Sequence, residues 1–360
     1  MRLSSIFSFD SWQMRWQWAP WMFLFVGLLV TAELLLRLPP VVERLPAPEP
    51  TLWHAELIET KVNYFEAFAA ERGVDVLFIG NSAMQSALDP AVFDAVRGIE
   101  STAVPGSFNA AIEGIPPYGA NLFLEIFLRH SQPDTIIYGL TPQDLNSNSP
   151  WAADITDRVR HSPMALAEAR RGLKGKTLAF LLDHSALFRY RLVLYRLLLA
   201  DPTIGEKPYV YFDERGYHPL NRNLAEVPPE QRGQFYNRAG VLNYSTSGVQ
   251  LDALRQLIER VQAEEIPLIL VNMPLANDYY GNFDAPQADY NLYWHTLTAV
   301  AHEYNLPLID LEGGGSITYF NDEHFADFNH LNRSGAERLS RILATHYLDL
   351  ITQSVTTALP

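Results

Sequence analysis

The sequence predicts an α/β protein in which helices cover both faces of a parallel sheet of about five strands. Short runs of branched and aromatic apolar residues lack polar alternation, which is typical of strands buried on both faces. These runs alternate with segments of helical pattern, which indicates parallel pairing through crossover connections. The expected strands cover residues 74–79, 101–104, 135–138, 268–271 and 306–310. This arrangement corresponds to a flavodoxin-like three-layer α/β/α sandwich.

Helix signals separate the expected strands. Asp89-Pro90 supplies a cap and a first-turn proline for a helix that reaches about Val96. Further helices are expected at about residues 119–129 and from about Arg333. Residues 145–246 interrupt the rhythm between the third and fourth strands, so we expect a mostly helical insertion there.

Composition bounds the function. The chain has 360 residues, 48% hydrophobic and 19% charged, enough for one large core or a domain with an insertion. A net charge of -14 argues against a nucleic-acid partner, which would require clustered positive charge. The chain has no cysteine, which excludes disulfides, thiolate metal sites and cysteine nucleophiles.

The amino terminus has the pattern of a membrane anchor. Residues 21–32 are uncharged and apolar, and Leu34-Leu35-Leu36 continue the run past Glu33. Tryptophans precede the run and arginines lie further out, at Trp16, Trp18, Arg2 and Arg15. We expect an uncleaved single-pass signal-anchor with the following domain outside the cytoplasm, because no clear cleavage site follows the run. A cleaved signal peptide is the alternative.

The domain division follows from this anchor and the prolines after it. Residues 1–50 would form a cytoplasmic tail, the anchor and a stiff Pro-rich spacer, and residues 51–360 the α/β domain. Within the insertion, residues 155–200 carry nine basic side chains against three acidic ones. Residues 187–199 read as one basic, strongly apolar helix that could lie on an anionic membrane, line a groove for an acidic polymer, or simply cap the domain.

Two segments far apart in the chain carry candidate chemistry. Ser82 follows the first strand in Gly80-Asn81-Ser82, at the edge where open α/β sheets bind ligands, although this could be a plain turn. Asp327 precedes His330 by three residues after the fifth strand, so its carboxylate can lie beside the imidazole. Because both segments follow parallel strands, we expect Ser82, His330 and Asp327 to meet as a catalytic triad.

These residues resemble the SGNH hydrolases, also called GDSL-like esterases. Gly80-Asn81-Ser82 is similar to the family's Gly-Asp-Ser block, with Asn in place of Asp. Residues 109–114 (Asn-Ala-Ala-Ile-Glu-Gly) resemble its second block, and Asp327 and His330 its final Asp-x-x-His block. The resemblance implies Ser82 as nucleophile, His330 as general base, Asp327 as its orienter, and the amides of Ser82 and Gly114 as oxyanion donors.

The third block departs from the family. The family places Gly-x-Asn-Asp after the third strand, where the Asn side chain stabilises the oxyanion. Residues 138–146 have no Asn in that register. Thr141, Gln143 or Asn146 could replace it, and Thr141 is included in the expected oxyanion set.

The anchor followed by this domain resembles membrane-tethered bacterial members of the family that move acyl groups on cell-surface polymers. The resemblance implies a serine esterase or O-acyltransferase without cofactor or metal, an acyl ester or polysaccharide substrate, and a membrane-bound acyl-donor partner. One alternative is a non-catalytic carbohydrate-binding or assembly protein on the same scaffold, and another is a soluble cytoplasmic esterase. A metal site is a further alternative, with the candidate ligands His324, Asp327, His330, Asp322 and Glu323.

Overall fold

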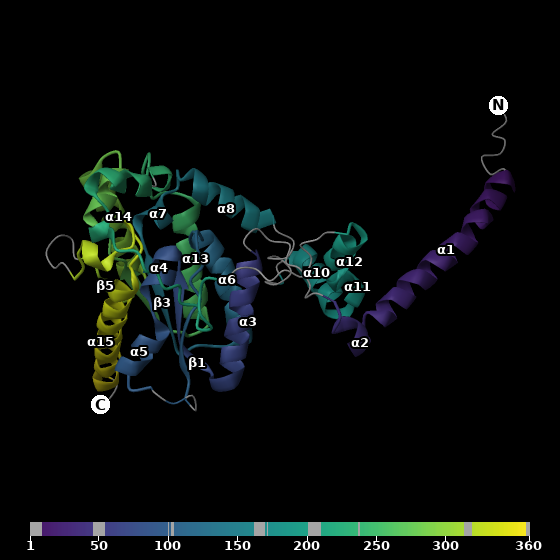
Figure 1. The fold of residues 1–360 in the computed structure, drawn as a ribbon, viewed down its shortest axis with the longest axis horizontal. Helices are drawn as coiled ribbons and strands as arrows, with labels where there is room; N and C mark the ends of the chain where they lie inside the picture. The colour runs from purple at the N-terminus through teal and green to yellow at the C-terminus, as the bar shows by residue number, and fades with distance from the viewer. Residues whose placement is uncertain are drawn as a thin grey trace. The chain divides into compact units, whose positions relative to one another are not determined.

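The computed structural model describes residues 9–45, 55–99, 101, 104–161, 170, 172–200, 210–236, 238–312 and 319–357 (Figure 1). The chain divides into two compact units. The first unit comprises Met1–Thr51 and Leu166–Pro208, and the second comprises Leu52–Ala165 and Tyr209–Pro360. The segment expected as one insertion is therefore shared between the units.

The second unit is built on a five-stranded sheet in which all pairings are parallel. The strands, in spatial order, are β2 (Gly106–Asn109), β1 (Val74–Gly80), β3 (Thr135–Leu140), β4 (Leu268–Asn272) and β5 (Leu308–Asp310). Every residue of β1, β3 and β4 is buried, which explains why these strands lack polar alternation. The predicted flavodoxin-like sheet of five parallel strands is confirmed.

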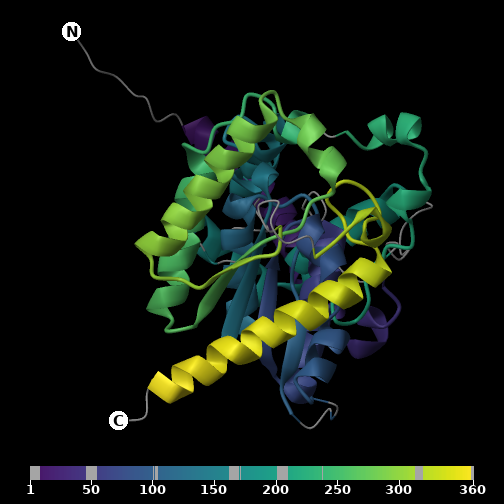
Figure 2. The same ribbon diagram turned by 90° about the vertical axis from the view of Figure 1, so that its left-hand side faces the viewer.

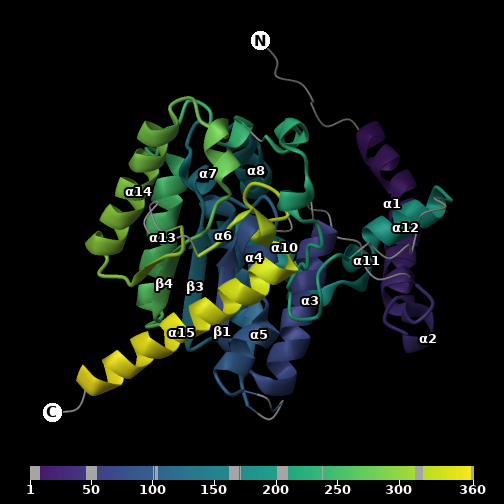
Figure 3. The ribbon, with the colours of Figure 1, turned by 60° about the vertical axis from the view of Figure 1, so that its left-hand side comes forward.

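Helices pack in two groups around this sheet. One group joins α3 (Ala55–Arg72), α6 (Pro117–His130) and α13 (Val249–Ala263) side by side. The other joins α4 (Ser82–Ala87), α5 (Pro90–Val96) and the long α15 (Arg333–Thr357), which crosses beside α5 (Figures 2 and 3). The remaining helices of the unit are α7 (Pro142–Leu145), α8 (Pro150–His161), α14 (Pro286–Glu303) and the short 3-10 turns η1 (Leu224–Glu226), η2 (Pro229–Phe235), η3 (Arg238–Gly240), η4 (Asn277–Asn282) and η6 (Asp322–His324).

The second strand lies later than predicted, at Gly106–Asn109 instead of residues 101–104, of which 102 and 103 lie outside the described residues. It escaped prediction because two of its four residues are polar. Both are fully buried and bonded: the amide of Asn109 donates to three backbone carbonyls at 2.9–3.3 Å, and the Ser107 hydroxyl donates to Pro90 O at 3.2 Å. Strand β2 therefore contains buried polar residues whose hydrogen bonds are made, at positions where apolar residues were expected.

The first unit is all helical in its described part. It consists of α1 (Phe9–Leu35), α2 (Pro39–Val42), α10 (Gly172–His184), α11 (Ala186–Arg189) and α12 (Arg191–Leu198). Leu36, Tyr190 and Val193 form its small buried core. The expected anchor falls on α1, and no helix within the described ranges is both long and apolar enough to span a membrane. Residues 46–50 of the expected spacer lie outside the described residues.

Glu33 joins the two chain segments of the first unit. Its carboxylate accepts hydrogen bonds of 2.9 Å from the Ser185 hydroxyl and from the backbone amides of Ala186 and Leu187. Glu33 therefore caps α11, because the first amides of a helix have no partner within it. The predicted single helix over residues 187–199 is wrong in one respect, since Tyr190 separates α11 from α12.

Candidate active site

The turn after β1 presents Ser82. Gly80 has φ +150°, and a Cβ there would lie 2.7 Å from the carbonyl oxygen of Gly139, so the turn requires glycine. The side chain of Asn81 caps α4 by accepting from the amide of Ala83 at 2.7 Å. Ser82 is the first residue of that helix, past the carboxyl end of a central strand.

The structure brings Ser82, His330 and Asp327 together across 248 positions of the chain. The Ser82 hydroxyl oxygen lies 2.8 Å from His330 Nε2, and His330 Nδ1 lies 2.8 and 2.9 Å from the two carboxylate oxygens of Asp327. The tautomer that satisfies all contacts donates from Nδ1 to Asp327 and accepts at Nε2 from the serine. Three side chains thus form one continuous hydrogen-bonded chain.

The loop that carries His330 is held by its own backbone. Ala326 N donates to His330 O at 2.8 Å, and the amides of Asn329 and His330 donate to Asp327 Oδ1 at 3.2 and 3.0 Å. The side chains of Phe325 and Phe328 are fully buried beneath the loop. These contacts fix the imidazole in place.

The interaction between Asp327 and His330 shifts the pKa of each residue in the direction opposite to the effect of burial. Burial lowers the pKa of His330, but the carboxylate of Asp327 raises it by more, so the pKa lies above its ordinary value. For Asp327, burial raises the pKa, and the His330 imidazolium together with three hydrogen bonds lowers it below its ordinary value. Asp327 therefore stays ionised and stabilises the protonated form of His330.

Gly114 lines the same cavity as Ser82. Its φ of +69° favours glycine, and a Cβ there would lie 3.0 Å from the indole of Trp151. Trp151 Nε1 donates to Gly114 O at 3.2 Å, and the preceding loop is tied to the end of β1 by the bond from Ile112 N to Gly80 O. Gly114, Ser82, His330 and Trp151 all line this cavity of about 300 Å³.

The three candidates for the missing donor occupy different surroundings. The Thr141 hydroxyl is buried and donates to Asp144 Oδ2 at 2.8 Å, while accepting from Asn81 Nδ2 at 3.0 Å. The amide of Asn146 donates to the carbonyls of residues 240 and 242. Gln143, by contrast, lines the cavity together with Ser82.

Two cavity residues were not among the expected site residues. Trp151 is 48% exposed beside Gly114, and Glu113 lines the cavity while accepting from the Tyr211 hydroxyl at 2.6 Å. Glu113 lies within the block at residues 109–114 that already indicated Gly114, whereas Trp151 comes from α8, outside every motif.

The metal alternative finds no support in the geometry. In the part of the chain that the structure describes, no group of three or more His, Cys, Asp or Glu side chains could hold a metal ion. His324, one of the alternative ligands, engages the side chain and backbone of Asn321.

Comparisons with known proteins give distant likenesses to solved structures. No protein-family model matches the chain, and no curated protein matches it. A lipase/acylhydrolase from Enterococcus faecalis is 15% identical, with a TM-score of 0.39 over 76% of this chain and 94% of its own.

Two further solved structures are similar at the same level. The acetyl xylan esterase AlAXEase is 13% identical, with a TM-score of 0.38 over 77% of this chain and 100% of its own. A GDSL-like lipase from Bacteroides thetaiotaomicron is 13% identical, with a TM-score of 0.35 over 84% of this chain and 100% of its own. Identities and TM-scores this low say nothing about chemistry, so the functional inference rests on the site itself.

Proposed function

We propose that this chain is a serine ester hydrolase of the SGNH type. The observation that carries the proposal is the hydrogen-bonded chain from Ser82 through His330 to Asp327 at the carboxyl edge of a parallel sheet. A nucleophile within reach of a base, which is itself oriented by a carboxylate, is the arrangement that covalent acyl chemistry requires.

The geometry supports the following order of reaction steps. Ser82 Oγ attacks the carbonyl carbon of an ester while its proton passes to His330 Nε2, which gives a tetrahedral oxyanion. The carbon–oxygen bond to the leaving alcohol then breaks, and His330 returns the proton to that alcohol. The acyl group stays on Ser82 until water, or a second alcohol, attacks with His330 again taking the proton.

We assign oxyanion stabilisation to the backbone amides of Ser82 and Gly114 and to the side-chain amide of Gln143. All three residues line the cavity that contains the nucleophile. Thr141 is less suited than the sequence suggested, because its hydroxyl hydrogen already bonds to Asp144. A positioned amide is the donor type that acts in such sites.

The acceptor of the acyl group decides between esterase and O-acyltransferase. Both reactions share the acyl-serine step. In the esterase reaction an acylated polysaccharide supplies the ester that is cleaved. In the acyltransferase reaction a polysaccharide hydroxyl accepts the acyl group. Mass spectrometry of products formed with an added sugar alcohol distinguishes free acid from a transferred ester.

We further propose that α1 attaches the protein to a membrane, with the second unit outside the cytoplasm. Apolar side chains between residues 21 and 30 are 39–78% exposed, and since they are nearly consecutive they cover every side of the helix. A helix that is apolar all round suits lipid. Replacing Phe23 and Val26 by glutamate should release the protein from sedimented membranes, because a charge costs about 2.5–3.5 kcal/mol in lipid.

A fluorophosphonate probe tests the proposed chemistry. The full chain should be labelled, Ser82→Ala and His330→Ala should lose labelling and hydrolysis of p-nitrophenyl acetate, and Ser149→Ala should keep both. Ser149 is the matched control because it lines the same cavity, and within the described residues its hydroxyl accepts from the amide of Ala152 and bonds to none of the three triad side chains. If the wild-type protein is not labelled, the esterase proposal is wrong, and the alternative of a non-catalytic carbohydrate-binding or assembly protein is favoured.

A further inference from the structure

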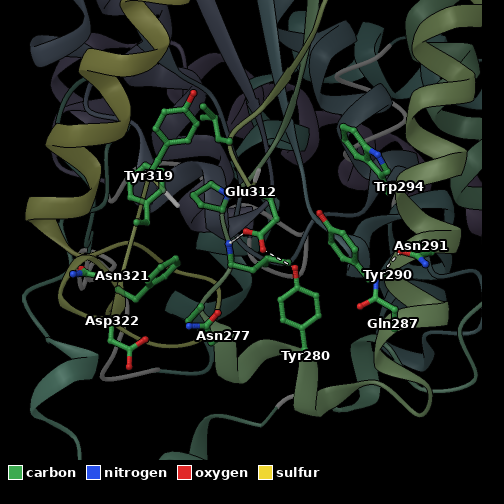
Figure 4. A pocket seen from close by; sticks show the side chains of 16 residues that line it. Asn277, Tyr280, Gln287, Tyr290, Asn291, Trp294, Glu312, Tyr319, Asn321 and Asp322 are labelled. Carbon is green, nitrogen blue, oxygen red and sulfur yellow. Dashed lines mark hydrogen bonds between the residues drawn. The ribbon is translucent and has the colours of Figure 1, made fainter. Parts of the chain in front are cut away.

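A second cavity opens in the same unit, away from the triad. It has a volume of about 430 Å³ and lies among α14, η4, the end of β5 and residues 319–322 (Figure 4). Its size suits one or two sugar rings or another ligand of that bulk. None of the three triad residues lines it.

Aromatic rings form much of the wall. Tyr280, Tyr290 and Trp294 come from η4 and α14, and Tyr319 faces them from the opposite side in Figure 4. Phe320 and Phe325 complete the set. Rings of this kind offer large flat apolar faces with polar edges, which match the C–H face and hydroxyl rim of a pyranose.

Neutral amides supply the polar part of the wall. Gln287 and Asn291 lie one turn apart on α14, and Gln287 Nε2 donates to Asn291 Oδ1 at 2.9 Å. This bond orients both amides, and the carbonyl oxygen of Gln287 and the NH₂ nitrogen of Asn291 take no part in it. A paired acceptor and donor can bind vicinal hydroxyls of a sugar. Asn277 and Asn321 line the cavity from the other walls.

Glu312 can act as a hydrogen-bond donor in the cavity. Its carboxylate already accepts 2.6 Å bonds from the Tyr280 hydroxyl and from the amide of Leu275. Burial raises the pKa of Glu312 to about 7, so near neutral pH the group is partly protonated and can donate to a hydroxyl. The other acidic residue that lines the cavity, Asp322, is paired with Arg232, whose Nη1 lies 2.7 Å from Asp322 Oδ2.

The two cavities share one structural wall. The loop of residues 325–330 contributes Phe325 to the second cavity and Asp327, Asn329 and His330 to the first. Both cavities lie beyond the carboxyl ends of the strands, one after β1 and β3, the other after β4 and β5. A chain of linked sugars could therefore occupy both along one edge of the sheet.

We propose that this second cavity is a saccharide subsite that binds a neutral pyranose unit of the acylated carbohydrate substrate. The proposal rests on the proposed esterase for the identity of its substrate, but binding itself does not depend on turnover. Trp294 supplies the stacking face, and Gln287 and Asn291 bind hydroxyl groups.

Calorimetric titration of the full-length Ser82→Ala protein tests the site without catalysis. The probes are xylopentaose, mannopentaose and cellopentaose, which are neutral and differ in their hydroxyls and ring substituents. At least one should bind with a Kd below about 1 mM. Trp294→Ala and, separately, Asn291→Leu should raise that Kd at least about tenfold, the effect of losing roughly 1.4 kcal/mol.

His295→Ala is the matched control, because this exposed residue lies next to Trp294 on α14 without lining the cavity. It should leave the Kd unchanged, and Trp294→Phe should retain part of the binding. Absence of binding by all three probes would overturn the proposal. So would a Kd that neither Trp294→Ala nor Asn291→Leu changes, or binding of tetramethylammonium in place of the sugars.

Failure of the subsite is separable from failure of the esterase. Hydrolysis of p-nitrophenyl acetate by the Trp294→Ala protein with Ser82 intact should equal that of wild type, because this small ester needs no distant sugar. Loss of sugar binding with intact ester hydrolysis disproves only the subsite. Sugar binding in a protein that fluorophosphonate does not label disproves only the esterase.

Discussion

The side-chain amide of Asn81 lies 2.8 Å from both carboxylate oxygens of Asp144, in the turn that presents the candidate nucleophile. The same carboxylate accepts from the backbone amide and hydroxyl of Thr141. Burial raises the pKa of Asp144 to about 6 despite these bonds. Asn81 therefore donates hydrogen bonds to the buried carboxylate of Asp144. An Asp at position 81, as in the SGNH motif that the sequence resembles, would place a second carboxylate there.

Asn81→Asp should destabilise the fold, and increasingly so at higher pH. Two buried carboxylates would face each other, and an uncompensated buried charge costs about 3–5 kcal/mol. Because the folded-state pKa of Asp144 is raised, its contribution to stability is largest at low pH and falls as pH rises through about 6. Calorimetric Tm values at pH 5 and pH 8 measure this, and adding Asp144→Asn should restore the Tm. An unchanged Tm at pH 8 would contradict the pairing.

Ester hydrolysis by the wild-type protein should rise with pH. Only neutral His330 can accept the serine proton, and the imidazole's pKa lies above its ordinary 6.5 because the effect of Asp327 exceeds that of burial. The kcat/KM profile for p-nitrophenyl acetate should therefore show an inflection above pH 6.5. An inflection below that value would disagree with the geometry.

Asp327→Asn should lower kcat by roughly 10⁴-fold, as expected when the orienting carboxylate of a triad is replaced. The remaining activity should titrate at lower pH, since the carboxylate no longer raises the pKa of His330. Stopped-flow measurement across pH separates the two effects. Asn329→Ala is the control, because Asn329 bonds to Asp327 through its backbone amide, which the substitution keeps. A small drop in kcat with no shift in the profile would argue against the triad.

Gln143→Ala should reduce kcat by about 10²–10³-fold with little change in KM, the loss expected for one oxyanion donor. Thr141→Val should instead reduce stability, because its buried hydroxyl bonds to Asp144 and Asn81. Steady-state kinetics and Tm of both proteins test the assignment. The opposite pattern, with the rate sensitive to Thr141 and not to Gln143, would return the donor to Thr141.

Glu33→Ala should loosen α11 in the first unit. The amides of Ala186 and Leu187 lose their acceptor, and removal of a helix cap costs about 0.5–2 kcal/mol. Hydrogen exchange of the peptide spanning residues 184–190 should accelerate, while exchange in α15 stays unchanged. Glu43→Ala serves as control, being exposed at the end of α2. Equal exchange in both variants would remove the capping role.

The sequence predicted those parts of the fold where local chemistry and tertiary packing agree. Strand β1 is apolar and buried on both faces, and α5 begins at its predicted Asp89-Pro90 cap. The meeting of Ser82 with His330 followed from parallel topology alone. In both elements the local residue pattern and the tertiary environment favour the same structure.

Prediction failed where a polar residue is satisfied by a distant partner. Strand β2 was displaced because Asn109 obtains its hydrogen bonds from the α4 segment, over 20 positions away. Glu33 interrupts an apolar run in the sequence, and its hydrogen-bond partners lie more than 150 positions later. The second cavity gathers side chains from several elements, none adjacent in a motif. Partners so remote leave no local pattern.

The shared loop at residues 325–330 has a consequence for the pattern of products. If a polymer occupies both cavities, the thickness of this one loop sets the offset between the recognised sugar and the ester that reaches Ser82. The ester that is cleaved would then lie at a fixed number of sugars from the one bound in the second cavity.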